Sequence, residues 1–323
     1  MLSRQLTNEQ RHRAAADFRR KVWEKYEITP FAHQADWILA GEGYALTDQI
    51  ADDGQLSEFV MLPDRTVERR LIVPRGGGAA HILTDLAGFK AGKSFSLAMW
   101  ACGYAGVQGA GVDFIGLEYD TSEPEFNYLT EFLLSERGMN LKAESFRNNK
   151  RDGSIWITLD NGTHFQVKSY RASRKSETMK GKTRDCYILT EAYQLPGMHV
   201  FTRVMQNLRQ RDGHVTIATT PDRAWVHELH QKAHGRDPYW HCVCDVDAAC
   251  NPETFDQAAR DRDDPDKGGL MTRERFDIAW RGKVERHIGA VYDYAQDAQM
   301  VSPLNFPMMW NEDAQLMALE VVA

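Results

Sequence analysis

Apolar residues near the start of the chain recur at the spacing of helices. Residues 7–26 predict a helix that opens on Thr7 and Gln10 as a capping box, in which each side chain satisfies a free backbone N–H. Pro30 ends this segment, and a second helical pattern follows over residues 31–41. The chain is therefore predicted to begin with two helices.

Further along, short apolar runs alternate with helical patterns. Asn161 and Gly162 mark the turn of a hairpin over residues 154–170. Residues 42–78 hold a strand pattern followed by three glycines, which predicts an insertion or a hairpin. Strands that alternate with helices favour a mainly parallel sheet covered on both faces, in the α/β class. The predicted buried strands are residues 79–87, 111–120, 185–193 and 214–222.

The stretch LAGFKAGKS, residues 86–94, lies between the first of these strands and a helix rich in small residues. A loop of the form G-x-x-x-x-G-K-S/T binds phosphates through backbone N–H groups at the positive end of the following helix. Gly92, Lys93 and Ser94 stand where this motif needs its glycine, its phosphate-binding lysine and its Mg²⁺-binding hydroxyl. Ala87 replaces the first glycine, and alanine suits that turn if its φ is negative.

Two later strand ends carry residues that suit ATP hydrolysis. Glu191 ends the run CYILTE, and an acid in such a place orients the attacking water in P-loop ATPases. Thr190 stands where an aspartate is usual on the metal side, and its hydroxyl can hold a Mg²⁺-bound water without adding charge. Thr219 and Thr220 end the next strand, where hydroxyls can sense the γ-phosphate. The alternatives are a surface carboxylate and an ordinary turn.

Composition excludes several classes of protein. The 323 residues are 42% hydrophobic and 26% charged, which is ordinary for a soluble globular protein. No apolar run approaches the roughly 18 residues of a membrane span, and five cysteines do not form a disulfide framework. A net charge of −7 argues against a protein that coats DNA by charge alone. Residues 1–26 and 169–184 nevertheless carry net charges of +4 and +5, which can meet phosphates.

The order of these features resembles the large terminase subunit of tailed double-stranded DNA phages. The resemblance runs from about residue 28 to residue 310, through the segments ITPFAHQADWI, GFKAGKS, MKGKTRDCYILTEAYQLPG, IATTP, CNPETFDQA and RGKVERHIGAVYDY. The family packages DNA into a procapsid with an ATPase domain and cuts it with an RNase H-like nuclease domain. The resemblance implies a P-loop NTPase fold of the ASCE or RecA-like type, with ATP and Mg²⁺ as cofactors.

The resemblance also assigns roles to single residues. Gln34 matches the adenine-reading glutamine, since an amide can pair with the N6 and N7 edge of adenine. Glu191 matches the catalytic glutamate, and Thr219 and Thr220 match the coupling motif. Mg²⁺ is expected at Ser94, Thr190 and Glu191. The loop residues expected to contact the nucleotide are Gly88, Phe89, Lys90, Ala91, Gly92, Lys93, Ser94 and Phe95.

This chain departs from the family at its cations. The family often has an arginine four residues before the loop lysine, but here Phe89 holds that place and Lys90 follows it. Lys180 stands where the family often has an arginine before the catalytic strand, and Arg184 is near. Either residue, or another arginine of this basic loop, is predicted to complete the site of a neighbouring subunit. Arginine offers phosphate a planar fork, whereas lysine is a point charge.

The resemblance divides the chain into an ATPase core over residues 1–245, a lid-like subdomain over 246–290 and a linker over 291–323. The core includes the N-terminal helices and the adenine-binding region. The linker leads toward a nuclease domain that the chain lacks; the alternative is a protein whose nuclease is separate or lost. Asp293, Asp297, Glu312 and Asp313 in or beside that linker are assigned no catalysis, so nuclease activity is not expected from this chain alone.

The implied partners are double-stranded DNA, a portal protein, a small terminase subunit and further copies of this chain in a ring. No membrane partner is expected, and the implied location is the cytoplasm of an infected bacterium. An SF1/SF2-type helicase or translocase is one alternative, although 323 residues leave little room for its second domain. A non-hydrolysing nucleotide-binding scaffold is another, which Ala87 and Thr190 permit.

Two further functions are disfavoured. The spacing of the loop motif and the missing lid arginines argue against a small-molecule kinase. A stretch rich in Cys and His over residues 227–250 makes a zinc site conceivable, but it contains no C-x-x-C pair. The alternation of YWHCVCDV is that of a strand, which favours packing roles for its cysteines.

Overall fold

The structure is a computed structural model that describes most of the first 284 residues. The described ranges are 6–173, 183–208, 211–223, 225–226, 228–229, 238–247, 251–263 and 272–284. All of them lie in one compact unit, Met1–Val284. The predicted linker over residues 291–323 lies outside the described ranges, as does Lys180.

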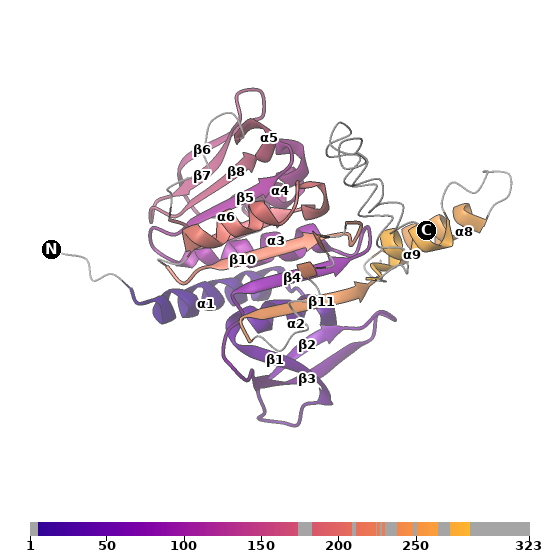
Figure 1. Ribbon diagram of the computed structural model, residues 1–323. Coiled ribbons are helices and arrows are strands. Elements are labelled where there is room, and N and C mark those ends of the chain that lie inside the picture. Colours follow the sequence, from indigo (N-terminus) through magenta and orange to yellow (C-terminus); the bar gives the residue numbers. More distant parts are fainter. Residues whose placement is uncertain are drawn as a thin grey trace, which may run out of the picture. The chain divides into compact units, whose positions relative to one another are not determined.

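Eight strands form the main sheet in the order β11-β4-β10-β9-β5-β8-β7-β6 (Figure 1). The pairs from β11 to β8 are parallel, whereas β7 and β6 are antiparallel to their neighbours. The α/β class with a mainly parallel sheet is thus confirmed. The strands are β4 (Ile82–Ala87), β5 (Gly111–Gly116), β6 (Ala143–Asn149), β7 (Ser154–Leu159), β8 (His164–Ser169), β9 (Cys186–Thr190), β10 (His214–Thr219) and β11 (Trp240–Val246).

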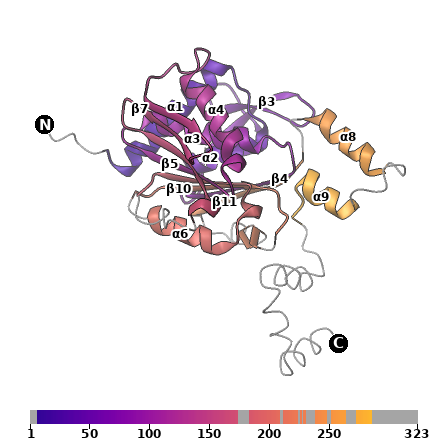
Figure 2. The same ribbon diagram turned by 90° about the horizontal axis from the view of Figure 1, so that it is seen from above.

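Helices cover both faces of this sheet, as Figure 2 shows for α3 and α4 on one side and α6 on the other. Neighbouring residues of a strand enter different cores: Leu83 packs with the helices of the first face and Ile82 with α6. A strand buried on both sides needs apolar residues at most successive positions, which explains the largely apolar runs. The helices are α3 (Lys93–Cys102), α4 (Glu123–Leu134), the short α5 (Tyr170–Ser173) and α6 (Met198–Leu208), with 3-10 turns η1 (Gly103–Gly106), η2 (Tyr119–Ser122) and η3 (Ala192–Gln194).

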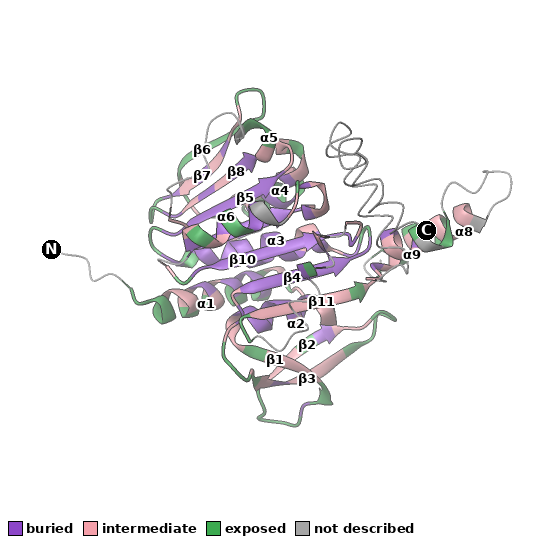
Figure 3. Cartoon of the chain, viewed as in Figure 1, coloured by how far each residue is buried: buried purple, intermediate pink, exposed green. Residues whose placement is uncertain are grey.

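The N-terminal region adds two helices and a second sheet. Helix α1 (Asn8–Tyr26) has the predicted Thr7–Gln10 capping box, and α2 (Ala32–Glu42) follows. The segment predicted as an insertion or hairpin is a three-stranded antiparallel sheet in the order β1-β3-β2. Its strands, β1 (Tyr44–Ile50), β2 (Ser57–Met61) and β3 (Val67–Pro74), are more exposed than the main sheet (Figure 3).

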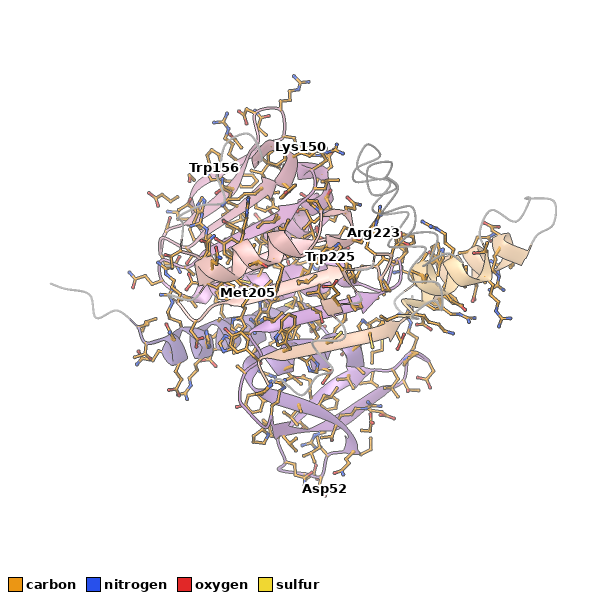
Figure 4. All side chains as sticks on the ribbon, viewed as in Figure 1. Asp52, Lys150, Trp156, Met205, Arg223 and Trp225 are labelled. Atoms are coloured by element: carbon orange, nitrogen blue, oxygen red, sulfur yellow. The ribbon has the colours of Figure 1, made fainter. Side chains whose placement is uncertain are left out.

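The remaining elements complete the edges. The predicted hairpin is β7 and β8, with Gly162 at a φ of 79° in the turn. Helices α8 (Pro252–Asp263) and α9 (Arg273–Arg281) follow β11. Figure 4 shows Arg223 and Trp225 beyond the carboxyl end of β10, and Asp52 at the far tip of the small sheet. Within the described ranges, no helix has the length and apolar character that crossing a membrane demands.

Candidate active site

The phosphate-type loop joins β4 to α3 at the carboxyl edge of the sheet, the edge where α/β proteins bind ligands (Figure 1). Ala87 ends β4, is fully buried and does not have a positive φ. Its small side chain therefore suits the place of the first glycine. The left-handed residues of the loop are Lys90, with a φ of 64°, and Gly92, with a φ of 83°.

The outer side of the loop is held by the segment predicted to be lid-like. The N–H of Gly88 donates to the carbonyl of Val246 at 2.8 Å, and the N–H of Phe89 donates to that of Ala279 at 2.6 Å. The side-chain amide of Asn251 donates to the carbonyl of Lys90 at 2.8 Å. A Cβ at position 88 would lie 2.1 Å from the carbonyl oxygen of Trp280, so glycine is required there by the approach of α9.

The inner side of the loop presents backbone donors. The N–H groups of residues 92–95 find no acceptor within the described part of the chain. They stand at the start of α3, where a helix leaves its first N–H groups unpaired and its dipole is positive. An anion such as a phosphate is the ligand that such an arrangement favours. The Phe89 and Phe95 side chains pack elsewhere: Phe89 meets Trp280 edge-on, and Phe95 packs against Tyr128 and Phe132.

Lys93 is folded back onto its own loop. Its Nζ donates to the carbonyls of Ala87 at 3.0 Å and Gly88 at 2.7 Å, and the residue is buried. Burial lowers the pKa of Lys93, and the charges of Glu191, Asp85 and Glu125 oppose that shift. The lysine therefore lies among three acidic residues.

Glu191 directly follows β9 at the same edge. Its φ of 42° is left-handed, a strained conformation for a residue other than glycine. Its Oε2 is shielded from solvent and has no hydrogen-bond partner within the described ranges. Burial raises the pKa of Glu191, and the charge of Lys93 opposes the shift. A strained, poorly solvated carboxylate beside a phosphate-type loop is a typical feature of a catalytic site.

Sequence reasoning missed two acidic residues of this site. Asp85 on β4 is 2% exposed, its Oδ1 has no partner within the described residues, and burial raises its pKa to about 7. Glu125 in the first turn of α4 is 3% exposed and lies near Ser94. Burial raises the pKa of Glu125 to about 7, against the effect of Ser94. A charge inside the apolar run ILTDLA was a usable signal for Asp85, but acids are common in first turns, so Glu125 gave none.

The hydroxyls at the two neighbouring strand ends are engaged within the protein. The hydroxyls of Thr190 and Ser122 lie 2.6 Å apart in a buried hydrogen bond, so the Thr190 oxygen predicted for the metal side is already bound. The Thr219 hydroxyl accepts the N–H of Tyr193 at 2.9 Å. The end of β10 is therefore attached to the turn that follows Glu191. Thr220 Oγ1 is buried with no partner within the described residues.

The start of α2 holds the loop from a third side. Gln34 donates through Nε2 to the carbonyl of Gly92 at 3.4 Å, while its Oε1 accepts the N–H of Phe31 at 3.1 Å. The ring of His33 lies 3.2 Å from the carbonyl of Ala91. Burial lowers the pKa of His33 to about 4, so a neutral ring donates to that carbonyl at neutral pH. Gln34 is thus beside the loop, and its reading of adenine stays a prediction.

Arg184, one of the two predicted finger residues, lies away from this edge. Arg184 precedes β9, at the opposite end of that strand from Glu191, and its Nε lies 2.7 Å from Asp113 Oδ1 in a buried ion pair. The guanidinium is therefore committed to its own chain. Lys180 is outside the described ranges. In the Cys- and His-rich stretch, His241 pairs with Asp36, and no group of three or more His, Cys, Asp or Glu side chains that could hold a metal ion occurs among the described residues.

Comparison with solved structures identifies the fold. The ATPase domain of the large terminase of Thermus phage P74-26 superimposes with a TM-score of 0.52, over 65% of this chain and 90% of that one, at 17% identity. A mutant of the same domain gives a TM-score of 0.50, over 63% of this chain and 89% of that one, also at 17% identity. This chain has the fold of a phage large-terminase ATPase domain. No family model matches the chain, and no curated protein matches it by sequence.

Three side chains near the phosphate-type loop carry oxygen atoms of the kind that a magnesium ion binds. Mg²⁺ prefers oxygen ligands and is usually bound through one or two carboxylates, with waters and substrate phosphates completing the octahedron. Ser94 offers a hydroxyl, and Glu125 and Glu191 each have a buried oxygen with no partner within the described residues. The donor set therefore fits Mg²⁺ beside the phosphate-type loop.

Proposed function

We propose that this chain is the ATP-hydrolysing motor domain of a phage terminase large subunit, and that it drives double-stranded DNA into a procapsid. The observation that carries the proposal is the pairing of a phosphate-type loop with Glu191, which follows a buried strand of the same edge. The likeness in fold to a terminase ATPase domain supports the choice among P-loop proteins. A portal protein, a small terminase subunit and other copies of this chain are the proposed partners.

The residues divide the work of hydrolysis as follows. The unpaired N–H groups at the start of α3 bind the phosphates, and Lys93 leaves its loop carbonyls to reach the β- and γ-phosphates. Glu191 orients a water for in-line attack on the γ-phosphate. Mg²⁺, when bound at Ser94, supplies neutralisation of the charge that develops on the phosphate oxygens.

Thr219 carries the state of the site to the rest of the domain. Its hydroxyl holds the backbone of the turn that begins with Glu191, so a movement of this turn after phosphate release displaces the end of β10. The surface that grips DNA is proposed to respond to that displacement.

The test is the variant Glu191→Gln, which keeps the shape of the side chain but removes its charge. General-base or water-orienting residues contribute about 10²–10⁴-fold to a rate, so DNA-stimulated ATP turnover should fall at least about 100-fold. Equilibrium binding of an ATP analogue should stay within a few-fold of wild type. The matched control is Glu228→Gln, an exposed acid of the same chain, which should leave turnover unchanged.

Full DNA-stimulated turnover in Glu191→Gln would contradict the site assignment. Duplex unwinding by the isolated chain would instead favour a helicase.

A non-hydrolysing scaffold is a second candidate, and Thr190 favours it. The strand end offers a hydroxyl that is bound to Ser122 where many P-loop ATPases have an aspartate. Tight ATP binding without turnover, even in an assembled ring with DNA, would decide for this candidate.

A further inference from the structure

The strand that leads into Glu191 brings no carboxylate to the metal side of the site. Thr190 occupies that position, is completely buried and shares a hydrogen bond of 2.6 Å with the hydroxyl of Ser122. Neither hydroxyl carries a charge that could offset a divalent cation. A site for magnesium and a triphosphate built on β9 alone is therefore one carboxylate short.

The same hydrogen bond fixes the start of α4. Ser122 immediately precedes this helix, and Glu125 lies three residues later in its first turn. Attaching Ser122 to the end of β9 brings this first turn beside the phosphate-type loop. Glu125 there is 3% exposed and lies close enough to Ser94, the residue that the loop motif assigns to Mg²⁺, for Ser94 to lower its pKa against the effect of burial.

One carboxylate oxygen of Glu125 is buried without a partner in the described part of the chain, which packing alone does not explain. Glu125 Oε2 is shielded from solvent and has no hydrogen-bond partner within the described residues. A buried polar atom without a partner lowers stability, and Ser122 gives the helix no side-chain cap that Glu125 would complete. A cation that binds with the nucleotide would give this buried oxygen the partner that the described residues do not supply.

We propose that Glu125 supplies the carboxylate that β9 lacks and, together with Ser94, holds Mg²⁺ and its water shell beside the phosphates. The inference rests on the proposed ATPase function and adds a metal-positioning residue to it. The acid comes from α4 rather than from the strand before the catalytic glutamate. The hydrogen bond from Thr190 to Ser122 is then what positions this helix, and the threonine is no longer a defect of the site.

The experiment measures the metal directly rather than turnover. Mn²⁺ replaces Mg²⁺ as a paramagnetic probe, and its affinity for the full chain saturated with ATPγS is measured by electron paramagnetic resonance. Glu125→Gln should weaken Mn²⁺ binding about 10–100-fold, the usual effect of removing a residue that orients metal ligands. The affinity for ATPγS in EDTA should stay within about twofold, because the loop amides are untouched.

Glu123→Gln is the matched control, since this acid lies in the same turn of α4 and is bonded to Lys150 away from the loop. It should bind Mn²⁺ as wild type does. Glu125→Asp retains the charge but withdraws it by one methylene, and its Mn²⁺ affinity should fall between those of wild type and Glu125→Gln. Thermal unfolding of each variant shows whether it is folded.

Equal Mn²⁺ affinity in Glu125→Gln, Glu123→Gln and wild type would overturn the inference and leave the ATPase proposal intact. A wild-type chain that binds no Mn²⁺ with ATPγS would overturn both.

Discussion

The two ends of the main sheet treat buried acids in opposite ways. At the amino end, Asp113 is bound by both Lys168 and Arg184. Asp185, near the start of β9, is likewise bound by arginines from α1 and from the turn after α6. Each of these carboxylates has at least one cation for each of its oxygens.

At the carboxyl end, three acids surround a single lysine. Asp85, Glu125 and Glu191 each have one oxygen without a partner within the described residues, and Lys93 donates to backbone carbonyls of its loop rather than to any of them. The acids of the amino end have their partners within the chain, whereas those of the carboxyl end each keep an oxygen that no described residue binds. The difference separates a structural network from a site.

Asp113→Asn should give the largest effect, and it tests whether the amino end of the sheet is a structural network. The change removes the carboxylate charge that Lys168 and Arg184 both contact, and removing one partner of a buried pair costs about 3–5 kcal/mol. Urea unfolding should show that loss, while the folded fraction binds nucleotide as wild type does. Asp222→Asn, which removes an exposed pair with Arg275, should cost about 1 kcal/mol or less. A weaker loss for Asp113→Asn than for this control would mean that the amino end is not a structural network.

Gly88→Ala tests whether the packing of α9 against the phosphate-type loop matters to nucleotide binding. The new Cβ would lie 2.1 Å from the carbonyl oxygen of Trp280, and such overpacking costs about 1–3 kcal/mol. Because the loop and α9 must separate, affinity for an ATP analogue should fall as well, which equilibrium fluorescence titration can measure. Gly76→Ala is the control, since a Cβ there meets nothing within 4 Å. Unchanged nucleotide affinity in Gly88→Ala would show that the docking of α9 does not matter to the loop.

Asp85→Asn should give the smallest effect, and it should be a gain. Burial raises the pKa of Asp85 from an ordinary 3.8 to about 7, so the folded state binds its proton more tightly than the unfolded state does. The wild-type chain therefore loses stability from this group as the pH rises from about 4 to about 7. Asparagine does not titrate, so the variant should exceed wild type by on the order of 1–2 kcal/mol at pH 8, and by less at pH 5. Urea unfolding at both values checks the sign, and an advantage that does not grow with pH would contradict it.

The sequence predicted the elements that are buried on both sides. The runs that became β4, β5, β9 and β10 are mostly apolar and are buried at every position, as a parallel strand covered on both faces is. Strand β6 was missed because its residues are almost all exposed, and its pairing with β7 defines it. The three strands over residues 44–74 were predicted only as an insertion or a hairpin, since their partial burial leaves a weak pattern.

The residues of the candidate site also fall into those that could be predicted from the sequence and those that could not. Gly92, Lys93, Ser94 and Glu191 could be found because backbone geometry fixes their spacing to a loop and a strand end. Glu125 could not, because its place depends on a hydrogen bond between side chains 68 positions apart. Ala87 does not have a positive φ, which is the condition under which alanine suits the place of the first glycine.

The hydrogen bond that Phe89 donates to Ala279, together with the close approach of Gly88 to Trp280, couples the loop to α9. Any free energy with which a nucleotide favours one shape of the loop is also a preference for one position of α9. Linkage is reciprocal. If nucleotide binding changes the equilibrium between two positions of α9 by some factor, then fixing α9 in one of these positions changes the nucleotide affinity by that factor. A contact made by α9, at a distance from every phosphate, can therefore regulate when this site fills and when it empties.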